Sequence, residues 1–144
     1  MNFIPGNPEF VAVVRASFAQ QGLMQMLGAT LDRVDAGAVD ISMPYRENLT
    51  QQHGFLHAAA ITAIADSASG YAALSLMPAG SEVLTIEFKV NLLRPAAGTR
   101  FVAEGRVVKP GKAITVSRAE VFAHAGGEPV LIATLLATMI ARAE

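Results

Sequence analysis

The amino-acid sequence predicts an α+β fold, with an antiparallel sheet of five or six strands wrapped around one long helix. The first observation is an alanine-rich apolar stretch over residues 57–77, which is typical of a helix buried in protein. The second is a series of four strand-like segments after it, separated by turns short enough for hairpins. The length of 144 residues is close to the usual size of one domain, so we expect residues 1–144 to form a single domain.

The first part of the chain predicts a short helix followed by two strands. Pro8 and Glu9 open an amphipathic segment that is expected to end near Gly22, so residues 1–22 form an N-terminal helical segment. Strands are expected at residues 29–35 and 38–43, with a turn between them. Residues 44–52 are polar and show no apolar period, which predicts an irregular connection.

The second part predicts the long helix and the remaining strands. The helix is expected over residues 57–77, because Pro78 and Gly80 stop it. Apolar and polar residues alternate over residues 83–93, which predicts a strand with one buried face. Further strands are expected at residues 100–109, 113–124 and 130–141. The last one is apolar on both faces, which fits the middle of a sheet or a subunit interface.

Composition excludes several classes of protein. Hydrophobic residues make up 52% of the chain and charged residues 16%, so the chain is not disordered. A net charge of −1 argues against a nucleic-acid binder that works by neutralising phosphates. The absence of cysteine removes disulfides, thiolate nucleophiles and zinc–thiolate sites. The mean hydropathy of +0.40 is high for a monomer and indicates surface covered by a partner subunit.

The sequence also predicts where the protein is found. The N-terminus lacks a basic region, and a proline stands where the apolar part of an export signal should begin. Polar residues such as Thr62 and Asp66 interrupt the apolar stretch, so we expect no membrane span. A cytoplasmic protein is therefore expected. We also expect no cofactor.

Asp66 is the strongest candidate for chemistry. It is the only acid between Glu47 and Glu82, and it lies in the middle of the predicted helix. A buried carboxylate is costly, so it should be hydrogen-bonded, raised in pKa or placed at a cleft. Thr62 and Ser69 lie on the same stripe of the helix. The alternative is that this stripe is the ordinary solvated side of an amphipathic helix.

The predicted start of the long helix is a second candidate. The first backbone N–H groups after His57 have no partner within the helix, and they can bind the oxygen of a polarised carbonyl. The alternative is that His57 only caps or packs the helix. Asp66 follows His57 by nine residues, about 13.5 Å along a helix and on its opposite side. If both act on one substrate, they must come from two subunits.

Other arrangements are weaker. His53 and His57 have the spacing of a helical metal pair, but Gly54 lies between them and no third ligand is evident, so we expect no metal. No serine-nucleophile or phosphate-loop motif is present. Residues 88–118 carry seven basic side chains and one acid, which suits a nucleotide-like polyanion; the alternative is that sheet edges carry charge for solubility.

Residues 51–66, from Gln51 through His57-Ala-Ala to Asp66, resemble the signature of hotdog-fold acyl-CoA thioesterases of the phenylacetate-degradation (PaaI-like) family. That signature has an Asn or Gln, then His-Gly-Gly six residues on, then an acid nine residues after the His. Residues 91–95 also resemble the family's strand that ends in a proline. The resemblance implies a hotdog fold, hydrolysis of acyl-CoA, and a homodimer that assembles into a homotetramer.

The resemblance also implies roles for individual residues. Asp66 would be the nucleophile or general base, and the Ala58 N–H of the other subunit would polarise the thioester carbonyl. Gln51 and His57 would position the thioester or water, and Thr85 would orient the water. The nucleotide of coenzyme A would lie near Arg94 or the turn that contains Lys109 and Lys112.

One departure leaves two functions open. The family's His-Gly-Gly is His57-Ala-Ala here, and the two methyl groups narrow the approach of a thioester. The sequence therefore predicts an acyl-CoA thioesterase, with a non-catalytic binder of acyl-CoA or small lipids as the alternative. A hydratase of acyl thioesters ranks lower, because His57 and Asp66 lie on opposite sides of the helix.

Overall fold

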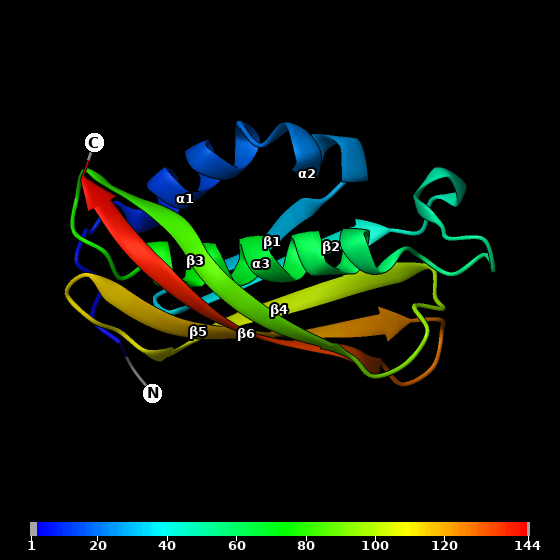
Figure 1. Ribbon diagram of the computed structural model, residues 1–144. Helices are drawn as coiled ribbons and strands as arrows, with labels where there is room; N and C mark the ends of the chain where they lie inside the picture. Colours follow the sequence, from blue (N-terminus) through cyan, green and yellow to red (C-terminus); the bar gives the residue numbers. More distant parts are fainter. Residues whose placement is uncertain (1–2, 144) are drawn as a thin grey trace.

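The computed structural model describes residues 3–143 as a six-stranded antiparallel sheet curved around a long helix (Figure 1). The order of strands across the sheet is β1-β2-β4-β5-β6-β3. The helices are α1 (Phe10–Ala19), α2 (Gly22–Leu27) and α3 (Ala58–Leu74), with a 3-10 turn η1 (Glu47–Leu49). The strands are β1 (Thr30–Asp35), β2 (Ala38–Pro44), β3 (Ser81–Leu92), β4 (Arg100–Lys109), β5 (Ile114–His124) and β6 (Val130–Ala143).

The sheet can wrap closely around α3 because the residues between them are small. A Cβ atom on Gly105 of β4 would lie 2.2 Å from the carbonyl oxygen of Ala68, so strand and helix meet backbone to backbone there. Ala65, Ala68 and Ala72 of α3 are fully buried. Larger side chains are buried in the same core, among them Ile41, Ile64, Phe101 and Met139. The alanine-rich composition of α3 therefore reflects its close contact with the sheet.

The arrangement of β3 corrects one prediction. The strand lies at an edge of the sheet, paired with β6 only, and neither of its faces is buried in the single chain. The expectation that one face is buried is therefore wrong within the chain. Five large apolar side chains in and just after β3 are 42–54% exposed: Leu84, Ile86, Phe88, Leu92 and Leu93. Such a concentration of exposed apolar surface is typical of a contact with another protein.

The N-terminal region also differs from the prediction. α1 ends at Ala19, and a second helix, α2, begins at Gly22, where the sequence predicted an end. Gln21 between them has an extended backbone, and Gly28 ends α2 in the left-handed region that favours glycine. Six residues are too few to give a helical pattern in sequence. α1 and α2 lie beside α3 and away from β4 and β5 (Figure 1).

The central elements agree with the prediction. His57 directly precedes α3, and β6 lies between β5 and β3, so the last strand is interior to the sheet, the first of the two places expected for it. Six strands are present among residues 3–143. No helix in that range is long and apolar enough to cross a bilayer.

Candidate active site

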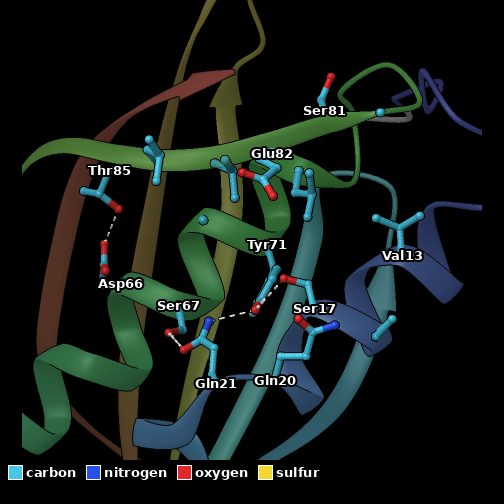
Figure 2. A pocket seen from close by; sticks show the side chains of 16 residues that line it. Val13, Ser17, Gln20, Gln21, Asp66, Ser67, Tyr71, Ser81, Glu82 and Thr85 are labelled. Atoms are coloured by element: carbon cyan, nitrogen blue, oxygen red, sulfur yellow. Dashed lines mark hydrogen bonds between the residues drawn. The ribbon is translucent and has the colours of Figure 1, made fainter. Parts of the chain in front are cut away.

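Asp66 lies half-buried on α3 and faces the edge strand. Its Oδ1 accepts a hydrogen bond of 2.8 Å from the hydroxyl of Thr85 in β3, nineteen positions later in the chain (Figure 2). Burial raises the pKa of the Asp66 carboxyl above its ordinary value, and the hydrogen bond from Thr85 offsets part of that rise. A half-buried carboxylate with one hydroxyl donor is a base that remains reactive toward water.

Ser69, on the same stripe of α3, is not solvated. Ser69 is fully buried, and its hydroxyl donates to the backbone carbonyl of Asp66 at 2.9 Å. The alternative of an ordinary wet helix face is therefore wrong for Ser69. Asp66 and Thr85 instead border a cavity of about 750 Å³ that lies between α1, α3 and the beginning of β3 (Figure 2).

The start of α3 forms a second feature. His57 Nδ1 accepts the N–H of Ala59 at 2.9 Å, so the capping role considered from sequence is confirmed. The N–H of Ala58, the first residue of the helix, has no acceptor among residues 3–143. Ala58 and Ala59 have helical backbone conformations, and within residues 3–143 only glycines have a positive φ. The conformational freedom of the family's two glycines is therefore not needed here.

Ala58 lines a hollow of about 430 Å³ together with Gln51 and Arg94. The side-chain oxygen of Gln51 accepts the backbone N–H of His53, which closes the turn before α3. Arg94 donates to the carbonyl of Leu131 at 2.7 Å, which holds its side chain against the sheet. Three of the residues predicted for the site thus gather at one end of α3.

The structure does not bring all of the predicted residues together. Asp66 follows Ala58 by eight residues, which is about 12 Å along the helix axis. Lys109 ends β4 and Lys112 lies in the turn after it, whereas Arg94 precedes the start of that strand. Ten residues of strand span about 33 Å, so Arg94 and the two lysines lie at opposite ends of the sheet.

No group of three metal-binding side chains is present in the part of the chain that the structure describes. Four polar residues near Asp66 were missed from the sequence: Ser17, Gln21, Ser67 and Tyr71. Ser67 and Tyr71 are four residues apart on one helix, and this spacing is the only feature of the sequence that could have indicated that they act together. The contact of α1 and the α1–α2 junction with α3, which completes the group, depends on tertiary packing.

Comparisons with known proteins agree with this architecture. A family model described as the thioesterase superfamily matches residues 53–130. The crystal structure of a thioesterase family protein from Silicibacter pomeroyi superposes with a TM-score of 0.92 and 50% identity, over 94% of this chain and 99% of that chain.

More distant relatives are found as well. A protein of Halobacterium salinarum, named provisionally as an esterase, is 30% identical over 115 residues, 76% of each chain. The PaaI protein of Escherichia coli, from the phenylacetic acid degradation operon, superposes with a TM-score of 0.83 over 94% of both chains. Its identity of 18% supports a likeness of fold alone.

Proposed function

The chain belongs to the thioesterase superfamily and has the PaaI-like hotdog fold, and from this premise we propose that it hydrolyses acyl thioesters of coenzyme A. The observation that carries the proposal is the half-buried carboxylate of Asp66, which accepts a hydrogen bond from Thr85 at the edge of a cavity. A base in this position can activate the water that a thioester hydrolase needs.

In the proposed reaction Asp66 acts as general base. Thr85 donates to one carboxylate oxygen, which leaves the other oxygen and the hydroxyl lone pairs free to accept hydrogen bonds from a water molecule. Asp66 takes a proton from that water molecule while the oxygen of the water attacks the thioester carbonyl carbon. The tetrahedral intermediate then breaks its carbon–sulfur bond, and the departing thiolate recovers the proton from Asp66. The raised pKa of Asp66 makes it a stronger base for this transfer.

The negative oxygen of the intermediate needs a donor, and the N–H of Ala58, which has no acceptor within residues 3–143, is suited to it. The start of a helix adds the positive end of its dipole to this N–H. Within one chain, however, about 12 Å of helix separates Ala58 from Asp66. One carbonyl cannot contact both, so the proposed site takes Asp66 from one chain and Ala58 from a second copy. His57 and Gln51, beside Ala58, position the thioester there.

The edge strand β3 is where this second copy is expected to bind. Its apolar side chains are exposed, and it carries Thr85 directly beside Asp66. The other edge strand, β1, has only six residues against twelve in β3, and a short edge strand offers less backbone for pairing. A homodimer through β3 therefore places a second chain next to the proposed base. Assembly of dimers into a tetramer is part of the proposal.

The nucleotide of coenzyme A is expected near Arg94, because this residue shares the hollow of Ala58. Lys109 and Lys112 lie at the far end of the sheet from it, so they would reach the same nucleotide only from another copy of the chain.

Release of free thiol from a panel of short, aromatic and long acyl-CoA thioesters tests the proposal. We expect saturable turnover of at least one thioester, with much slower cleavage of the matching oxygen ester. Saturable binding of acyl-CoA without thiol release from any substrate would identify the binding protein instead, and would contradict the proposed hydrolysis.

Thr85→Ala is expected to move the acid limb of the pH profile of kcat/KM to higher pH. Thr85 lowers the pKa of Asp66 by donating to its carboxylate, so removal of the hydroxyl raises that pKa and a larger share of Asp66 is protonated at neutral pH. The change is measured from pH-rate profiles. Thr85→Ser keeps the hydroxyl and is expected to restore the limb; a limb that stays unmoved in Thr85→Ala would contradict the role of Thr85.

A further inference from the structure

The cavity beside Asp66 contains a continuous chain of hydrogen bonds. The hydroxyl of Ser67 donates to Gln21 at 3.2 Å, the amide of Gln21 donates to the Tyr71 hydroxyl at 2.7 Å, and that hydroxyl shares a hydrogen bond of 3.1 Å with Ser17. All four side chains line the cavity and come from α1, α3 and the turn after α1 (Figure 2). The wall opposite β3 is therefore polar over much of its length.

These groups retain capacity for a ligand. The Gln21 amide has two N–H donors, and only one of them is bonded to Tyr71 within residues 3–143. The Tyr71 side chain is 3% exposed, and its ring is fixed edge-on against Phe18, with centroids 6.2 Å apart. The hydroxyl is thus held in place at the cavity wall. A hydrocarbon chain against this wall would displace water from polar groups and give them no partner in return.

The charges of the lining are of one sign. Within the described part of the chain, the charged residues that line the cavity are Asp66 and Glu82, and both are acidic. Among residues 3–143, no lysine, arginine or histidine lines the cavity, so a carboxylate placed there would meet two negative charges and no positive one from this part of the chain. A ligand group that suits this surface is therefore uncharged and forms hydrogen bonds.

Resting on the proposed thioesterase activity, we propose that this cavity binds the acyl group and selects thioesters whose far end carries a neutral hydroxyl. Tyr71 follows Asp66 by five residues, which is about 7.5 Å along α3. An extended six-carbon chain with a terminal hydroxyl spans a similar distance, about 7.5 Å, because each of its six bonds advances a zigzag chain by about 1.25 Å. Gln21 and Tyr71 are then the residues that determine specificity.

Three CoA thioesters of equal length test this inference: hexanoyl, 6-hydroxyhexanoyl and adipoyl. We expect kcat/KM to be about five- to tenfold higher for the hydroxylated thioester than for hexanoyl-CoA, the scale of one or two hydrogen bonds. Adipoyl-CoA, which ends in a carboxylate, is expected to be the poorest of the three. In Gln21→Leu and in Tyr71→Phe the ratio of the hydroxylated to the plain substrate should fall toward one.

Gln25→Leu is the matched control, since Gln25 lies on the exposed side of α2 and does not line the cavity. It should keep the wild-type ratio. Equal rates for hexanoyl- and 6-hydroxyhexanoyl-CoA in the wild-type protein would overturn the inference and leave the proposed hydrolysis intact. So would a preference that survives in both variants, each shown to be folded by its thermal melt. Absence of thiol release from all three thioesters, and from the broader panel, would instead reject the proposed function.

Discussion

Replacing Asp66 by asparagine is expected to lower kcat for thioester hydrolysis by about 10²–10⁴-fold, the usual scale for a lost acid–base group. Asparagine has the shape of aspartate and can still accept the hydrogen bond from Thr85, but it cannot take a proton from water. The change therefore removes the proposed chemistry with little change in packing. Thiol release under saturating substrate measures it, and activity like that of the wild-type protein would exclude Asp66 as the base.

The same variant should melt at a higher temperature than the wild-type protein at pH 7. The pKa of Asp66 is raised in the folded chain, so the folded state binds a proton more readily than the unfolded state and ionisation of Asp66 destabilises the fold. That cost is fully present above the raised pKa and disappears as the pH falls to the ordinary value of 3.8. The difference in Tm should therefore close toward acid pH. A fall in Tm at pH 7 would mean that the carboxylate is stabilising.

Local patterns were sufficient to predict the central elements and the candidate base. The alanine-rich stretch and the turn residues after each strand depend on neighbours along the chain, and they place α3 and the last four strands within a few residues. Asp66 was identified because a single acidic residue in an otherwise apolar helix is costly to bury without a partner. Both predictions rest on information that lies within a short window of sequence.

The parts that were missed depend on contacts between distant segments. The alternation of apolar and polar residues in β3 is the same whether its apolar face is covered by the core or by another copy of the chain. The sequence pattern therefore could not distinguish an edge strand from a buried one. Gln21 and Tyr71 meet only because the turn after α1 packs on α3, fifty positions away. No pattern in either segment indicates that their polar groups share a cavity wall.

Ala58→Pro tests the other half of the proposed site and should lower kcat by about 10²–10³-fold, the loss expected for one donor to the oxyanion. Proline has no N–H, and it is favoured as the first residue of a helix, where Ala58 stands. His57 before it has φ −63° and ψ 139°, which suits a residue that precedes proline. The N–H that is lost has no partner within residues 3–143, so the fold should be kept. A thermal melt checks this.

The two inactive variants together decide whether one chain or two build the site. If Asp66 of one chain works with Ala58 of another, a mixed dimer of Asp66→Asn and Ala58→Pro contains one intact site and one site with both defects. Random mixing of equal amounts, by refolding or co-expression, should then restore about a quarter of the wild-type activity, because half of the dimers are mixed and each has one working site. Sites made within single chains would give mixtures no more active than the separate variants. That result would reject the shared site. The shared site is proposed because eight residues of helix, at about 1.5 Å each, place Ala58 about 12 Å from Asp66 in one chain, too far for both to contact one carbonyl.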